Sequence, residues 1–342
     1  MKLITYYTRK GLNLGAAAVL AASIFPISIT AQAANEFTVA HSMTTDHIFH
    51  NTSQWLEEEL EKRGSTLKMN YHPAGDLGDW TSLFEQNIQG VIPMVMGWPD
   101  SAFDPRLDLA YLAYVVDDWE TATKVYGPAG KMLNVYTDIL AQQGLIVLGT
   151  IPTGFGSVAI RKGAGKLPVN FPEDAKGIKV RVPGLKIAEM RFNAFGFSAV
   201  PIPFSELYTA LQLGTVDGRT FGPPVEIWQM RDVLEAYILT RDFFEHAFLT
   251  VNKDWWDDLG SEEQKILREA SDAALARAWK EAEALGDNFL EKVRGHGIQV
   301  VELTPEQLNK AKEIVYETEW PFMESIVGSE IMDEMRAVAG IK

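Results

Sequence analysis

The chain has 342 residues, of which 46% are hydrophobic and 23% charged, and its formal net charge is −15. This length and apolar content suffice for two lobes with buried cores, and they exclude a disordered chain. The excess of acidic residues argues against nucleic acids and anionic membrane surfaces as partners. Because there is no cysteine, disulfides, thiol nucleophiles and thiolate metal sites are excluded.

The first 33 residues have the pattern of a cleavable signal peptide. Three basic residues occupy the first ten positions, an apolar stretch runs from residue 14 to residue 29, and Ala31-Gln32-Ala33 is a small-residue cleavage site. A retained anchor is the alternative, but Pro26 interrupts the stretch. We expect cleavage near Ala33, export to the periplasm, and no stable membrane insertion, since no later run approaches ~20 uninterrupted apolar residues.

The exported part begins with two β-α units. A strand is predicted at 37–42, and residues 44–64 carry capping residues, spaced apolar side chains and a terminating glycine, which predict a helix. A second strand is predicted at 67–73, then a helix from Trp80 to Gln89 and an apolar strand at 91–98. Repeated β-α units indicate an α/β fold with mostly parallel sheets.

Further elements follow in the middle and C-terminal parts of the chain. Their ranges are 144–150, 157–162, 177–182, 197–202 and 245–253 for strands and 185–195 and 204–213 for helices. After Asp254 the pattern is helical almost throughout, and residues 261–294 begin with the capping-box sequence Ser-Glu-Glu-Gln. Because the apolar residues of this long helix are mostly alanine, we expect it to pack along a monomer, with a coiled-coil dimer as the alternative.

Catalytic and metal-binding signatures are scarce. The motifs G-x-S-x-G and H-E-x-x-H and the P-loop are absent. His47 and His50 lie one helical turn apart beside Asp46 and could seat a metal, but such pairs at a helix start are usually solvated, so we expect no metal and no cofactor.

Five aromatic residues lie beside glycine or proline at predicted strand ends, turns and helix starts. Core packing explains any one of them, but as a set they indicate the wall of a pocket where strands end. They are Trp80, Trp98, Phe155, Phe221 and Trp228.

The segment GIKVRVPG (177–184) places an arginine just before the end of a strand. A period of two puts Val180 and Val182 on one face and Lys179 and Arg181 on the other. A half-exposed strand with a solvated polar face is one interpretation, and contact with a ligand is the other.

Four motifs occur in order along the chain and carry a family resemblance. They are NYHPAGDLGDWTSLFEQNIQG, GIKVRVP, AFGFSAVPIPFSELYTALQ and GTVDG. Together they resemble the solute-binding proteins of tripartite ATP-independent periplasmic (TRAP) transporters, of the C4-dicarboxylate-binding (DctP) type, over essentially the whole chain.

The resemblance implies a two-lobed α/β fold, similar to type II periplasmic binding proteins, with a mixed sheet flanked by helices in each lobe. Hinge strands join the lobes and a long helix spans both. We expect lobe I to comprise residues 34–156 and about 245–282, and lobe II residues 157–244 and about 283–342.

The resemblance also implies that Arg181 forms an ion pair with the solute's carboxylate. A guanidinium at the carboxyl end of a parallel strand suits that role. Two positions depart from the family pattern: Gly156 stands where many members carry a second arginine, and Phe221 where many carry an asparagine. The loss of one fixed charge disfavours a dicarboxylate, because an unpaired carboxylate in a closed cleft is costly.

We therefore expect a monomeric receptor that captures a monocarboxylate or a zwitterion between Arg181 and the aromatic residues. Asp46, Asp100 and Glu226 are candidates for holding a cationic portion. Closure of the lobes around the solute would then present it to a membrane permease of small and large subunits, without a chemical reaction.

Several alternatives remain at this point. The solute of the same receptor could be a small amine or a dicarboxylate. A periplasmic enzyme on a two-lobed scaffold, a binding protein of an ATP-driven importer and a structural envelope protein are the rival classes.

Overall fold

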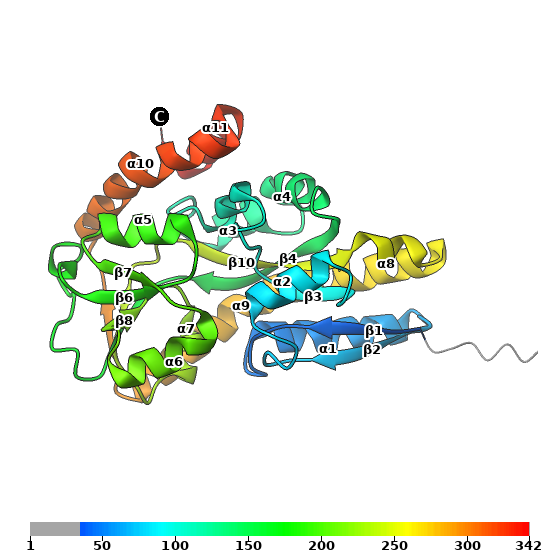
Figure 1. Ribbon diagram of the computed structural model, residues 1–342, viewed down its shortest axis with the longest axis horizontal. Helices are drawn as coiled ribbons and strands as arrows, with labels where there is room; N and C mark the ends of the chain where they lie inside the picture. The colour runs from blue at the N-terminus through cyan, green and yellow to red at the C-terminus, as the bar shows by residue number, and fades with distance from the viewer. Residues whose placement is uncertain (1–34, 342) are drawn as a thin grey trace, which may run out of the picture. The chain divides into compact units, whose positions relative to one another are not determined.

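The computed structural model describes residues 35–341, so the predicted signal peptide lies outside the described residues. Two mixed sheets organise this part (Figure 1). The first has the order β2-β1-β3-β10-β4 and consists of β1 (Asn35–Ala40), β2 (Leu67–His72), β3 (Met94–Gly97), β4 (Leu145–Phe155) and β10 (Phe244–Asn252). The second has the order β11-β9-β5-β8-β6-β7 and consists of β5 (Val158–Arg161), β6 (Lys179–Val182), β7 (Ser198–Pro201), β8 (Gly218–Arg219), β9 (Leu234–Leu239) and β11 (Gln299–Glu302).

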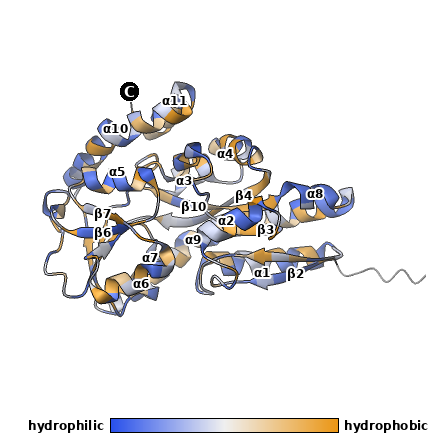
Figure 2. Ribbon diagram, in the orientation of Figure 1, coloured by the Kyte–Doolittle hydropathy of each residue, from blue (hydrophilic) through white to orange (hydrophobic). Residues whose placement is uncertain are grey.

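Helices flank both sheets, and most carry hydrophilic and hydrophobic residues together (Figure 2). This mixture is typical of helices that cover a sheet with one face. None of the helices among residues 35–341 combines the length and apolarity needed to cross a membrane. The helices are α1 (Ile48–Lys62), α2 (Trp80–Ile88), α3 (Trp119–Tyr126), α4 (Met132–Ala141), α5 (Lys186–Ala194), α6 (Phe204–Leu213), α7 (Pro224–Gln229), α8 (Lys253–Asp258), α9 (Ser261–Gly295), α10 (Pro305–Val327) and α11 (Ser329–Ala339), with 3-10 turns η1 (Pro105–Tyr111) and η2 (Glu173–Ala175).

The predicted two-lobed α/β fold is confirmed by these two sheets. In the first, β1 pairs in parallel with β2 and β3, while β10 runs antiparallel to β3 and β4. In the second, β6 lies in parallel between β7 and β8. The predicted β-α order accounts for the parallel pairs, and the antiparallel β10 comes from the chain returning late to the first sheet. The exact lobe boundaries stay a prediction.

Two extended segments join the sheets. The long strand β4 leads into β5 through Gly156, whose amide donates to the carbonyl of Phe243 at 2.9 Å. Phe243 belongs to the segment that leads from β9 into β10. The two crossings are therefore hydrogen-bonded to each other where the chain passes between sheets.

The helix α9 packs against α1 and β4 of the first lobe and against α7 of the second. Its buried positions recur at spacings of three and four residues, as one face of a helix requires. They are Leu267, Ala270, Ser271, Ala274, Leu275, Ala278, Trp279 and Ala282, followed by Phe289 and Val293. The alanine-rich face of α9 is therefore buried against both lobes.

A fully buried ion cluster lies where α5, α10 and a crossing segment meet. Arg191 donates from Nε to Glu319 at 2.7 Å, from Nη2 to the second Glu319 oxygen at 2.9 Å, and from Nη1 to Asp242 at 2.8 Å. Its Nη2 also donates to the carbonyl oxygen of Tyr111. All three charged side chains are inaccessible to solvent, so the cluster ties η1 to both helices and to the crossing.

Candidate functional site

A pocket is lined by residues of both sheets and of their connecting segments. It encloses about 440 Å³ of space between protein atoms, part of it open to solvent. Its aromatic lining consists of Trp80, Trp98, Tyr111, Phe204 and Phe221. Its charged lining consists of Arg181, Arg219, Glu226 and Glu245.

Arg181 lies near the carboxyl end of β6, between Val180 and Val182, which are fully buried in the core. The side chain of Arg181 is only 3% exposed, and its Nε donates to the carbonyl of Ile202 at 2.8 Å. No carboxylate among residues 35–341 forms an ion pair with it. Burial, followed by the charge of Arg219, lowers the pKa of Arg181 to about 9, so the guanidinium stays cationic at neutral pH.

Arg219 and Glu226 form a buried ion pair beside Arg181. Nη2 of Arg219 lies 2.6 Å from Oε2 of Glu226, and both side chains are almost inaccessible. Gly222 lies against this pair with φ +84°, and a Cβ at this position would overlap the guanidinium of Arg219. Glycine is therefore required both by the backbone conformation and by the close approach. The charge of Arg219 is balanced within the protein.

Glu245 brings a second carboxyl group into the pocket from β10. The residue is 6% exposed, and its Oε2 has no hydrogen-bond partner. Burial, and then the charge of Glu226, raise the pKa of Glu245 well above its usual value. A buried carboxyl oxygen without a hydrogen-bond partner is energetically unfavourable.

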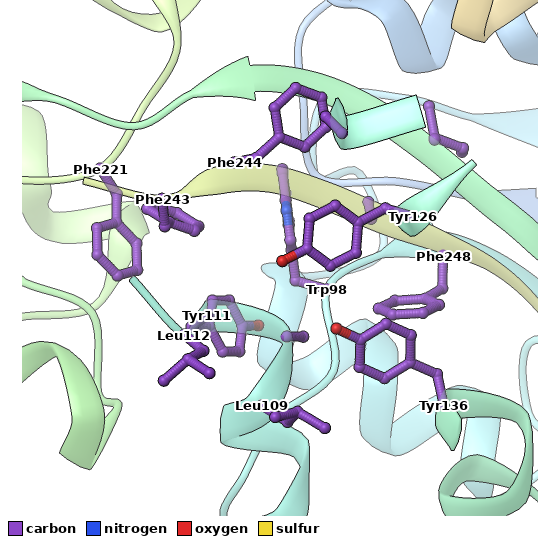
Figure 3. Close-up of a cluster of buried hydrophobic side chains, with 14 of the residues drawn as sticks. Trp98, Leu109, Tyr111, Leu112, Tyr126, Tyr136, Phe221, Phe243, Phe244 and Phe248 are labelled. Atoms are coloured by element: carbon purple, nitrogen blue, oxygen red, sulfur yellow. The ribbon is translucent and has the colours of Figure 1, made fainter. Parts of the chain in front are cut away.

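Phe221 forms part of the wall in a conformation that is uncommon for a non-glycine residue, with φ +63°. Its ring lies 4.2 Å from that of Phe243 and stacks on Tyr111 at 6.2 Å between centroids (Figure 3). The guanidinium of Arg191 lies 5.4 Å from the centroids of both phenylalanine rings. The buried ion cluster thus packs, through Arg191, against the two rings of this part of the pocket wall.

The structure brings together most of the residues predicted for the site. Those that line the pocket are Arg181, Trp80, Trp98, Phe221 and Glu226. Asp100 lines an adjoining cavity that shares Trp80 and Arg181 with the pocket, and its Oδ1 accepts from the amide of Ala102 at 2.9 Å.

Four other predicted residues lie elsewhere. Phe155 lines a separate cavity, where the guanidinium of Arg241 lies 4.1 Å from its ring centroid. Trp228 packs edge-on against His296, Asp46 is exposed, and a Cβ at Gly156 would overlap the ring of Phe243. Gly156 is thus explained by packing, and a ligand contact for these four residues stays a prediction.

The sequence interpretation missed four of the aromatic and charged residues of the lining. Arg219 directly follows the Asp-Gly motif, and Glu245 is an acidic residue at the start of the apolar run EHAFLTV, which is the signal that could have identified it. Tyr111 and Phe204 carried no distinguishing pattern. Sequence alone did not indicate that two arginines and two glutamates converge.

Of the two histidines considered for metal binding, His50 belongs to a hydrogen-bond network with His41 and Tyr71. His41 Nε2 and His50 Nδ1 lie 2.8 and 2.9 Å from the hydroxyl oxygen of Tyr71, while His47 is buried on the aromatic ring of Phe49. Within residues 35–341 no three His, Asp or Glu side chains gather in a metal-binding arrangement.

Comparison with known proteins gives a consistent family relationship. Residues 39–323 match the model of "Bacterial extracellular solute-binding protein, family 7" (DctP). The ectoine/5-hydroxyectoine-binding periplasmic protein UehA of Ruegeria pomeroyi is 26% identical over 331 residues, covering 94% of this chain and 95% of the relative. The ectoine-binding periplasmic protein TeaA of Halomonas elongata is 25% identical over 274 residues, covering 77% of this chain and 78% of the relative.

Solved structures show the same fold. The periplasmic ectoine-binding protein of the TeaABC TRAP transporter of Halomonas elongata superposes with a TM-score of 0.82 at 22% identity, covering 89% of this chain and 99% of that one. The sugar acid binding protein DctPAm of Advenella mimigardefordensis, solved with galactonate, also gives 0.82, at 23% identity, with 89% and 97% covered. The chain belongs to the DctP family, the solute-binding receptors of TRAP transporters.

Proposed function

We propose that this receptor captures a small organic solute with one carboxylate, a monocarboxylate or a zwitterion, in the pocket between its two sheets. The observation that carries the proposal is Arg181, a buried guanidinium with no carboxylate partner among the described residues. A solute carboxylate would accept parallel hydrogen bonds from its terminal nitrogens, a charge-assisted and geometrically matched contact.

The charges of the pocket favour one solute carboxylate over two. Arg219 already has Glu226 as its partner at 2.6 Å, which leaves Arg181 as the available cation in the lining. A second solute carboxylate would lie near Glu226 or Glu245 without a counter-charge, and a buried unpaired charge is strongly destabilising. The names of two relatives, both ectoine-binding proteins, also favour a zwitterion.

Solute binding would act through the equilibrium between open and closed lobes. A solute that contacts Arg181 on β6 and Trp98 after β3 at once has higher affinity for the closed state and shifts the population toward it. The closed form, exported to the periplasm after removal of residues 1–33, would then deliver the solute to the membrane permease. The lobes in this proposal are residues 34–156 with about 245–282, and 157–244 with about 283–342.

Thermal unfolding and titration calorimetry test this function. The mature chain is unfolded and refolded to remove carried-over ligand, then tested with dicarboxylates, monocarboxylates, sugar acids, zwitterions and amines. A solute at about 100 times its Kd adds about 2.7 kcal/mol of stability. Strong binding of succinate without binding of any zwitterion or monocarboxylate would overturn the proposal.

A pair of arginine variants tests the site itself. Arg181→Met should weaken binding by about 2–5 kcal/mol, a loss of roughly 30- to 5,000-fold. Arg231→Met is the matched control, since Arg231 stacks on Trp228 at 4.3 Å outside the pocket, and it should retain affinity within about threefold. Equal affinities of the two variants would contradict a role for Arg181.

A further inference from the structure

The charged residues of the pocket do not all have partners. Two of them, Arg219 and Glu226, form an ion pair with each other. The other two, Arg181 and Glu245, form no ion pair among residues 35–341, either with each other or with a third group. The lining therefore offers one cation and one carboxyl group to a bound molecule.

Glu245 is positioned by backbone structure and not by a salt bridge. It lies at the second position of β10, opposite Gly154 of β4, and its main-chain carbonyl accepts from the hydroxyl of Thr153 at 3.0 Å. Its side chain is 94% covered, yet Oε2 has no partner. The strand and the Thr153 contact involve only the backbone of residue 245, while the backbone of Gly222 and the charge of Arg219 act on its carboxyl group and favour the ionised form.

We propose that Glu245 binds a cationic N–H group of the solute, so that the receptor takes zwitterions that span from Arg181 to Glu245. This inference rests on the proposed function and specifies its solute class. An ammonium or amidinium would supply the missing hydrogen-bond donor and the missing counter-charge together. The aromatic lining, which includes Tyr111 and Phe221, excludes water and adds cation–π attraction.

The position of Glu245 also predicts a preference among zwitterions. A quaternary ammonium can lie against aromatic rings, but it has no N–H to donate to Oε2. A solute with N–H groups leaves no orphaned carboxyl oxygen, whereas a quaternary solute of equal size does. The receptor should therefore favour protonated amines and amidines over betaines.

Proton release on binding follows from the same geometry. Burial and Glu226 favour the protonated carboxyl of Glu245 in the empty pocket, while a bound cation favours its ionised form. Binding of a zwitterion should therefore release protons, whereas binding of an analogue without the cationic group should not. The charged and titratable groups around Glu245 are Glu226 on α7, Arg219 on β8, Arg181 on β6, Tyr111 on η1, Tyr237 on β9 and Asp242 before β10.

The test is calorimetric titration of the refolded mature chain with matched solute pairs. The zwitterions are ectoine, proline and 4-aminobutyrate, and their counterparts without a cation are cyclohexanecarboxylate, cyclopentanecarboxylate and pentanoate, with glycine betaine as the quaternary probe. Titrations in two buffers of different ionisation enthalpy measure the protons released. The variants are Glu245→Gln, which keeps the size of the side chain, and Arg181→Met.

We expect at least one N–H zwitterion to bind the wild type tenfold or more tighter than its cation-free counterpart and than glycine betaine. Glu245→Gln should weaken binding of that zwitterion 10- to 100-fold, leave the affinity for the cation-free counterpart within threefold of the wild type, and abolish proton release. Its melting temperature without ligand should equal or exceed that of the wild type, since glutamine cannot take up the charged form that burial disfavours at this position.

Two results would overturn the inference: zwitterion binding by Glu245→Gln within threefold of the wild type, or wild-type binding to none of the zwitterions. Arg181→Met separates this failure from that of the proposed function. If Arg181→Met loses all carboxylates while Glu245→Gln loses none, the receptor function stands and the role of Glu245 falls. If Arg181→Met also retains full affinity, the proposed function fails.

Discussion

Replacing Arg191 by methionine should destabilise the protein by about 3–5 kcal/mol. Arg191 makes three hydrogen bonds of 2.7–2.9 Å to Glu319 and Asp242, and a fourth contact to the carbonyl of Tyr111. Summing four charge-assisted bonds at ~1.5–3 kcal/mol each would give a larger loss. The smaller value applies because the orphaned carboxyl groups can take up protons, which limits the penalty of a broken buried ion pair.

The loss should depend on pH, and the sign follows from the orphaned carboxylates. Even with Arg191 present, burial raises the pKa of Glu319 above its usual value. Without the arginine, the folded-state pKa of Glu319 rises further above the unfolded value of ~4. The folded variant then binds more protons than the unfolded chain, so its stability falls as pH increases above about 4. The deficit relative to the wild type should be small near pH 4.5 and full at pH 8.

Urea unfolding at several pH values, followed by tryptophan fluorescence and far-UV circular dichroism, measures this deficit. Adding Glu319→Gln to Arg191→Met removes one orphaned carboxylate and should recover part of the stability at pH 8. A deficit below about 1 kcal/mol at pH 8, or an equal deficit at pH 4.5 and pH 8, would refute the reasoning that a buried charge network links α5, α10 and the crossing segment.

Further changes test single residues by unfolding measurements. Burial raises the folded-state pKa of Asp108 to about 6, so its charge destabilises the fold above pH 6 by about 2–3 kcal/mol and not below pH 4. Asp108→Asn should therefore be more stable than the wild type at pH 8 and equal to it at pH 4, and equality at pH 8 would contradict this. Gly222→Ala should lose about 2 kcal/mol or more, because φ is +84° and the methyl group enters the guanidinium of Arg219. The matched control is Gly286→Ala, because Gly286 lies within α9 and no atom is within contact distance of a new Cβ there. This change should raise the stability by about 0.5–1 kcal/mol. Similar effects of the two changes would show that the clash with Arg219 and the backbone strain at Gly222 do not determine the loss.

Local patterns predicted the elements that carry Arg181. Alternating apolar residues and a Pro-Gly stop identify β6, and the β-α order indicates its parallel pairing, which the structure confirms. The alanine period of α9 likewise predicted a helix along the body of the chain. These predictions succeed because each depends on the spacing of residues within one element.

Such patterns could not predict contacts between segments that are distant in the sequence. Phe155 and Phe221 both follow strands, but only Phe221 lines the pocket with Arg181, whereas Phe155 packs beside Arg241 in another cavity. Glu245 enters the pocket because β10 returns to the first sheet after five of the six strands of the second sheet, β5 to β9. The order of the strands in the sheets decides which strand ends lie close together. An alternating sequence pattern shows only which face of its own strand each residue occupies.

The long helix α9 imposes an uneven mutational constraint on the chain. Its 35 residues span about 52 Å at 1.5 Å per residue, and its alanine face contacts elements of both sheets. Ala278 is buried, so a larger side chain there would clash with the elements on which α9 packs. The exposed Ala276, two positions earlier, faces solvent and can be enlarged without such a clash. We infer that substitutions in this helix are tolerated on its solvent-exposed face and not on its buried face, although alanine occurs on both faces.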